Sequence, residues 1–64
     1  MKYQVTFFSD KYKPVAAIIE SESKTKILMG DWKKAALKVC QKRNWNKKEM
    51  EDYGYKTFKS RLAE

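Results

Sequence analysis

The apolar residues in the middle of this chain repeat with the period of an α-helix. They fall at positions 28, 29, 32, 35, 36, 39 and 40, a spacing that keeps them on one face of a helix. The pattern predicts a long helix over residues 24–43, with Ser23 as its N-cap and Asn44 as its stop. Such a helix needs an apolar surface to pack against, which the rest of the 64-residue chain must supply.

Two features favour a shorter helix. Gly30 inside a helix costs about 1 kcal/mol relative to alanine, and Lys24 and Lys26 would lie at the end of the helix dipole that disfavours positive charge. The alternative is a strand at 25–29, followed by a helix that Asp31 caps. We favour the long helix because the apolar phase does not slip across Gly30.

Two strands are expected before the helix. Tyr3, Val5 and Phe7 alternate with polar residues, which is the period of a strand with one buried face. The apolar run 15–19 follows a polar loop and reads as a second strand. The two strands together predict a hairpin.

Two further elements are expected after the helix. Asn46, followed three residues later by Glu49, matches a capping box and predicts a short helix over 47–53 that Gly54 ends. Residues 55–62 fit either a helix or an edge strand with one solvated face. We favour the strand, because a third strand gives a small sheet independent stability.

These elements predict a single α+β domain over residues 1–64. Its antiparallel sheet has two or three strands, in the chain order ββαβ, and packs on one long basic amphipathic helix. The alternative with a strand at 25–29 is βββα. A chain of this size buries only about 60% of the surface that its unfolded form exposes. Its two tryptophans, four tyrosines and three phenylalanines must therefore supply much of the core.

The net charge of +7 comes from one quarter of the chain. Residues 33–48 hold seven basic side chains and no acidic one, whereas eight basic and eight acidic side chains balance in the remainder. A concentrated positive field attracts phosphate backbones and acidic proteins. The charge therefore points to the class of partner.

Three of these basic residues form one row on the predicted helix. Lys34, Lys38 and Lys42 are spaced i, i+4 on the side away from Trp32 and Val39. Steps of about 6 Å along this row lie close to the phosphate spacing of a nucleic-acid strand. This predicts a small non-catalytic nucleic-acid-binding module, DNA or RNA, that contacts the phosphate backbone. The predicted contact residues are Lys34, Lys38, Lys42, Arg43, Trp45, Lys47, Lys48, Lys59 and Arg61.

Aromatic residues near the basic tract have two interpretations. Trp45 either staples the chain to the core, which we favour, or stands out as a stacking platform. If 55–62 is a strand, its outward face places aromatic and basic residues beside Phe8, as in several proteins that stack nucleic-acid bases. That face would hold Tyr55, Thr57, Lys59 and Arg61. We favour the other interpretation, in which Phe8 and Tyr55 close the edge of the core.

The composition gives catalysis little support. The chain has no histidine, which removes the usual general base near neutral pH and the usual metal ligand. Cys40 is the one cysteine and falls on the apolar helix face, which predicts a core thiol. We therefore expect no enzyme activity, no metal and no cofactor.

The cysteine count also indicates in which cellular compartment the protein functions. One cysteine cannot form an intramolecular disulfide, and the N-terminus lacks the apolar core of a signal peptide. The longest apolar run has five residues, too few to cross a bilayer. We expect a cytoplasmic protein with no membrane partner.

The alternative function is a protein-interaction or inhibitor module that binds an acidic protein partner. Basic charge would steer this association, with aromatic side chains as anchors. In size and style the chain resembles the small proteins that phages and mobile elements encode. That resemblance covers no specific motif and assigns no residue a role, but it favours an interaction role. A homodimer that completes a free sheet edge is also compatible with the sequence.

Overall fold

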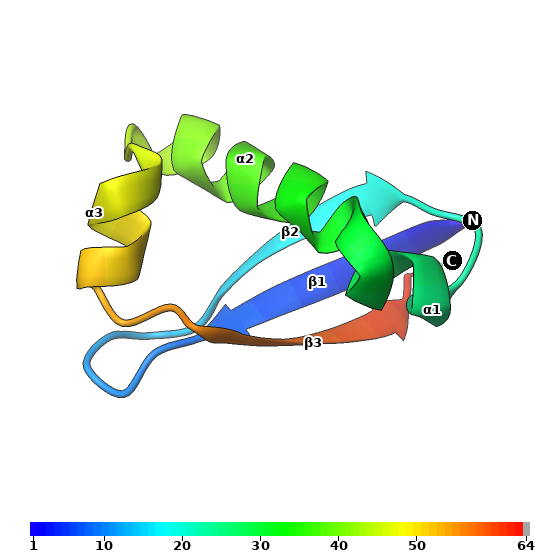
Figure 1. Ribbon diagram of the computed structural model, residues 1–64, viewed down its shortest axis with the longest axis horizontal. Helices are drawn as coiled ribbons and strands as arrows, with labels where there is room; N and C mark the ends of the chain where they lie inside the picture. Colours follow the sequence, from blue (N-terminus) through cyan, green and yellow to red (C-terminus); the bar gives the residue numbers. More distant parts are fainter. Residues whose placement is uncertain (64) are drawn as a thin grey trace.

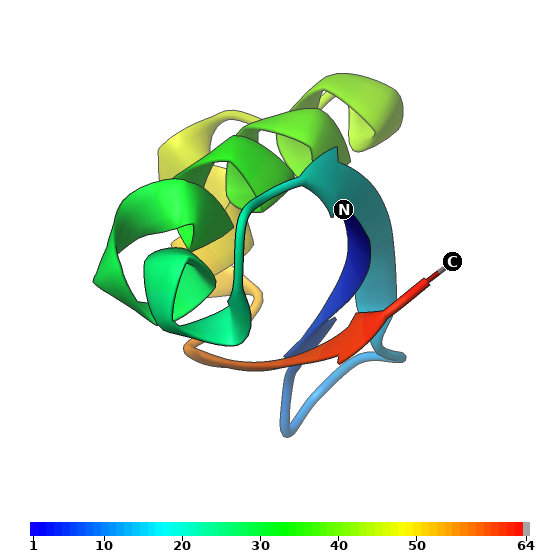
Figure 2. The same cartoon turned by 90° about the vertical axis from the view of Figure 1, so that its right-hand side faces the viewer.

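The computed structural model describes residues 1–63 and shows a three-stranded antiparallel sheet with all its helices on one face (Figures 1 and 2). The elements in chain order are β1 (Lys2–Phe8), β2 (Val15–Glu20), α1 (Lys24–Lys26), η1 (Ile27–Asp31), α2 (Trp32–Arg43), α3 (Lys47–Asp52) and β3 (Thr57–Leu62). The predicted α+β class and ββαβ order are confirmed. The C-terminal segment is a strand, as favoured, and not a helix.

The first strand lies in the middle of the sheet. The strand order is β2-β1-β3, and both neighbours run antiparallel to β1. Val5 lies opposite Ala17 on one side and Ser60 on the other, so these three residues share the face that the helices cover. The alternate residues of each strand form an open face, which Figure 2 shows on the side away from the helices.

One helical segment connects β2 to the rest of the chain. It runs over 24–43 as α1, η1 and α2, which confirms the favoured long helix, and the alternative strand at 25–29 does not form. The Ser23 hydroxyl accepts a hydrogen bond from the Lys26 amide at 3.2 Å, which caps the first turn. Asn44 ends the segment in the left-handed conformation, with φ of 58°. Both predicted caps are confirmed.

The helical phase slips at Gly30, contrary to expectation. The segment is kinked within η1, where Gly30 leaves the helical region with a φ of 175° and a ψ of −20°, and the Trp32 amide donates to the Ile27 carbonyl, five residues back. A turn that holds one extra residue rotates the preceding part of the helix relative to the rest. Ile27 is therefore fully buried, whereas Leu28 and Met29, which the pattern placed on the core face, are 68% and 75% exposed.

The core lies between the covered face of the sheet and the helices. Its buried side chains are Tyr3, Val5, Phe7, Val15, Ile19, Ile27, Ala35, Val39, Cys40, Met50 and Tyr55. Trp32 is half-buried, and its ring stacks on Phe58 with the centroids 5.7 Å apart. Tyr55 precedes β3 and is buried, with its hydroxyl donating to the Lys13 carbonyl at 2.7 Å. The expectation that Tyr55 shares the open face of the strand is therefore wrong, and the favoured core reading holds for this residue.

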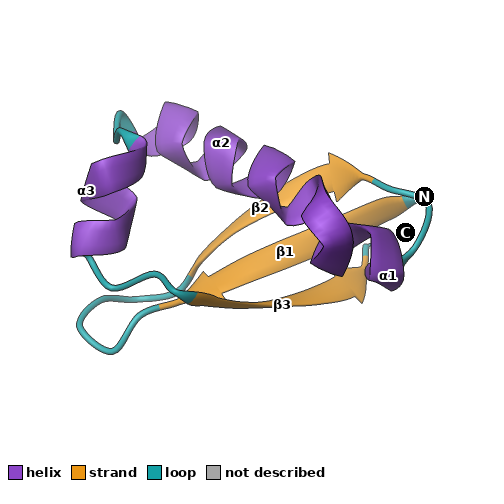
Figure 3. Ribbon diagram, viewed as in Figure 1, coloured by secondary structure: helices purple, strands orange, loops and turns teal. Residues whose placement is uncertain are grey.

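The short helix α3 closes the end of the core. Asn46 and Glu49 form the predicted capping box, in which the Glu49 amide donates to Asn46 Oδ1 at 2.8 Å. Gly54 follows with a φ of 83°, a conformation that L side chains rarely adopt. The segment between α3 and β3 runs beside the β1–β2 loop (Figure 3). The Tyr12 and Tyr53 rings meet edge to face, with their centroids 5.1 Å apart.

The phase slip predicts opposite outcomes for two neighbouring residues. Ile27→Ala is expected to cost about 2 to 5 kcal/mol of the free energy of unfolding, because it leaves a cavity at a fully buried site. Leu28→Ala is expected to stay within about 0.5 kcal/mol of the parent, because Leu28 is exposed. Urea unfolding followed by tryptophan fluorescence measures both. A larger loss for Leu28→Ala would contradict the slip.

Candidate nucleic-acid interface

The helix α2 has two flanks with different neighbours. One flank packs beside β2, and the other packs beside α3 (Figure 1). Each flank borders a groove: Lys38 and Lys42 line the first, Lys33 and Lys47 line the second, and the other basic side chains of 33–48 line neither. The predicted continuous basic surface is therefore not a single row in three dimensions.

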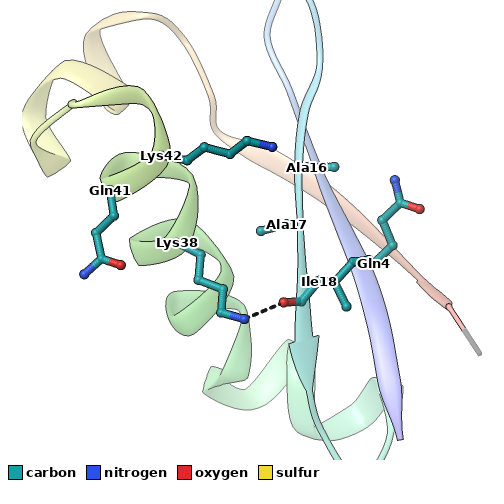
Figure 4. Close-up of a pocket in the computed structure, with 7 residues that line it drawn as sticks. All are labelled: Gln4, Ala16, Ala17, Ile18, Lys38, Gln41 and Lys42. Atoms are coloured by element: carbon teal, nitrogen blue, oxygen red, sulfur yellow. Dashed lines mark hydrogen bonds between the residues drawn. The ribbon is translucent and has the colours of Figure 1, made fainter.

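The groove between α2 and β2 has a mixed polar and apolar lining, and none of the residues 1–63 that line it is acidic. It has a volume of about 730 Å³ and is lined by Gln4, Ala16, Ala17, Ile18, Lys38, Gln41 and Lys42. Lys38 and Lys42 extend from the helix toward the strand (Figure 4). The Lys38 ammonium donates to the Ile18 carbonyl at 2.8 Å, which places that charge at the mouth of the groove. Among residues 1–63, Lys42 has no ion-pair partner, so its charge is available to a ligand.

Lys34, the first member of the predicted row, lies in a different environment. Its ammonium is 3.7 Å from Asp31, and the depression around it includes Glu20 and Glu22. These carboxylates offset its charge, so Lys34 adds less to the positive field than Lys38 and Lys42 do. The three lysines share a helix flank but not an electrostatic role.

The open face of the sheet continues the groove. The Arg61 guanidinium donates two hydrogen bonds to Gln4 Oε1, at 3.1 and 2.8 Å, and Gln4 itself lines the groove. Arg61 and Ile18 both lie opposite Gln4 in the sheet, on its two sides. Lys59 precedes Arg61 by two residues in β3, so it lies on the same face of the sheet, where it pairs with Thr6. Lys59 and Arg61 thus lie on the open face of the sheet, opposite the face that α2 covers, and Arg61 reaches the groove lining through its contact with Gln4.

Trp45 packs against the core, as we expected from the sequence. Its ring is half-buried and packs on Tyr53 and Tyr55, with centroids 4.9 and 5.7 Å away. The Arg43 guanidinium lies 5.8 Å from the centre of the Trp45 ring, a cation–π contact. Because other rings contact Trp45, it is not a free platform for stacked bases. Arg43 and Trp45 belong to an aromatic cluster at the end of the molecule, beyond the groove.

Lys47 and Lys48 lie on α3, across α2 from the β2 groove. Lys47 lines the second groove, between α2 and α3. Of the nine predicted contact residues, Lys38 and Lys42 line the β2 groove, and Arg61 contacts its lining residue Gln4. The structure places the other six elsewhere, namely Lys34, Arg43, Trp45, Lys47, Lys48 and Lys59.

Sequence reasoning missed the uncharged half of this groove. Gln4, Ala16 and Ile18 line it from the sheet, and Gln41 lines it from the helix. The period-two alternation identifies Gln4 as outward-facing, so part of the signal is present. No local pattern in the sequence indicates that the helix lies over the edge of β2.

No group of three or more His, Cys, Asp or Glu residues within 1–63 could hold a metal ion. Cys40 is buried, and burial together with the negative charge of Glu49 raises the pKa of its thiol above the ordinary value. A raised pKa keeps the thiol protonated and unreactive near neutral pH.

Comparison with known proteins finds no family model, no curated protein and no solved structure that matches this chain. Within residues 1–63, no helix is both long and apolar enough to cross a bilayer.

The environment of Cys40 predicts a substitution that increases its reactivity. Glu49→Gln removes the negative charge but can keep the capping box, so the pKa of Cys40 should fall and its alkylation by iodoacetamide should become faster. Mass spectrometry across a pH series measures the rate. Glu51→Gln, a change of the same charge at an exposed site, is the control and should leave the rate unchanged. An equal acceleration in both variants would contradict the assignment to Glu49.

Proposed function

We propose that this protein is a nucleic-acid-binding module that holds a phosphate backbone along the groove between α2 and β2. The acid-free lining of this groove, with Lys38 and Lys42 on one wall, is the observation that carries the proposal. Phosphate contacts supply most of the affinity of such modules and act largely without regard to sequence.

The geometry suits a backbone more than a single small anion. Lys38 and Lys42 are one helical turn apart, a rise of about 6 Å that lies close to the phosphate spacing of one strand. Arg61 and Lys59 extend the positive surface from the groove onto the open sheet face. A strand that lies along the groove can therefore meet successive positive charges.

The uncharged groups of the groove also suit this ligand. The Gln4 and Gln41 amides carry both donors and acceptors, and the Lys38–Ile18 hydrogen bond is exposed and can exchange for a phosphate contact. The open face carries only one exposed aromatic ring, Phe8, among the residues described. We therefore expect binding dominated by charge, with a weak preference for sequence.

Charge-removing variants on the two flanks of α2 test this proposal. Lys38→Gln with Lys42→Gln should weaken binding to all sequences and should lower the slope of log affinity against log salt by about 1 for each lysine removed. Fluorescence anisotropy with labelled duplex DNA, single-stranded DNA and RNA, at several salt concentrations, measures both quantities.

Two control variants separate position from total charge. Lys47→Gln with Lys48→Gln removes the same charge from the other flank and should reduce affinity much less. Lys38→Arg with Lys42→Arg keeps the charge and should retain binding. Equal losses in the two glutamine variants would show that only diffuse charge matters, and no binding to any nucleic acid at low salt would contradict the proposed function.

A further inference from the structure

The second groove of the molecule, between α2 and α3, is apolar. It has a volume of about 350 Å³, and its floor is formed by Ala36, Cys40 and Met50. Trp32 and Trp45 lie at its two ends. Methionine and cysteine are soft side chains that adapt to the shape of what packs on them. The groove therefore has the character of a site for apolar side chains.

The outer lip of this groove exposes a large apolar residue to solvent. Leu37 lines the groove and is 59% exposed, although it lies on a helix that packs on a core. Leu28 and Met29 are also exposed, but they lie in η1 beyond Gly30 and do not line the groove. Leu37 and the apolar lining of the groove together form one exposed apolar patch. Contiguous apolar patches on a protein surface mark interaction sites.

The charges at the groove restrict what can occupy it. Lys33 and Lys47 are the charged residues among the described residues that line it. Two acidic residues of α3 lie close by: the charge of Glu49 acts on Cys40, and Glu51 lines the adjoining depression beside Lys47. The Lys33 ammonium lies 5.9 Å from the centre of the Trp32 ring, which holds this charge beside the apolar floor. A ligand that fills the groove should therefore combine apolar side chains with flanking negative charge.

Two other occupants fit less well. A second copy of this chain would bring Lys33 and Lys47 of both molecules together, in a protein that carries a net charge of +7. An added β-strand would find few backbone partners here, because the groove lies between two helices whose backbones are largely hydrogen-bonded internally. An amphipathic helix needs only apolar contacts and complementary charge.

From these observations we infer that the α2–α3 groove docks an amphipathic helix of an acidic protein partner. Its apolar residues, at i, i+3 or i+4 and i+7, enter the groove over Ala36 and Met50, and its acidic residues meet Lys33 and Lys47. This surface shares only Gln41 with the lining of the β2 groove, and its two lysines are different ones, so the inference does not depend on the proposed nucleic-acid binding.

A designed peptide tests the inference. The probe is a synthetic helical peptide with leucines at i, i+4 and i+7 and glutamates on its flanks, and the comparison peptide carries lysines in place of the glutamates. Because Trp32 and Trp45 both lie at the groove, intrinsic fluorescence reports occupancy without a label. We expect saturable binding of the glutamate peptide and at least about tenfold weaker binding of the lysine peptide.

Matched variants locate the binding surface. Leu37→Ser should weaken the glutamate peptide about tenfold, whereas Leu62→Ser, at a residue 47% exposed on β3, should not. Lys33→Glu with Lys47→Glu should reverse the preference and select the lysine peptide. Circular dichroism checks that each variant is folded.

Several results would overturn the inference. They are equal binding of the two peptides, an unchanged affinity in Leu37→Ser, or no reversal in the charge-exchanged variant. A dimer in sedimentation that Leu37→Ser dissociates would assign the groove to a second copy instead. A loss of nucleic-acid binding in the charge-exchanged variant, with Lys38→Gln and Lys42→Gln without effect, would assign it to nucleic acid.

Discussion

One helix has to cover a whole face of a three-stranded sheet, and the rest of the structure depends on how it does so. Ala35 is fully buried, and its small side chain lets α2 approach the sheet closely, while Val39 and Ile27 fill the space on either side along the helix. A single helix leaves room at both of its flanks. The β2 groove and the α2–α3 groove are these two spaces, and α3 closes the end of the second.

The difference between the two grooves follows from which side chains reach each flank. Lys38 and Lys42 extend toward β2, whereas Ala36, Leu37 and Cys40 line the side toward α3, and Gln41 borders both grooves. Among the described residues, the first groove has a mixed lining with two lysines and no acidic side chain, and the second is mostly apolar with two lysines at its rim. A small domain of this kind can thus present two chemically distinct surfaces on one helix, which is the basis for proposing separate ligands for them.

Local signals in the sequence predicted most elements of the fold. Ser23, the Asn46–Glu49 pair and Gly54 mark helix ends by chemistry that acts within a few residues, and these positions are confirmed. The slip at Gly30 could not be read, because the choice of Ile27 over Leu28 for the core depends on the position of the sheet beneath them. The site was predictable only in part for the same reason. The i, i+4 row of lysines was visible, but its division between Asp31, the β2 groove and α3 is a tertiary property.

Amide shift mapping by NMR tests the separation of the two surfaces most directly. The ¹⁵N-labelled protein would be titrated with the oligonucleotide that binds most tightly at low salt. The account predicts that the largest shifts fall on residues 16–18, 38–42 and 59–61, around the β2 groove. Shifts concentrated on residues 33–37 and 45–50 would place nucleic acid in the apolar groove and would contradict the account.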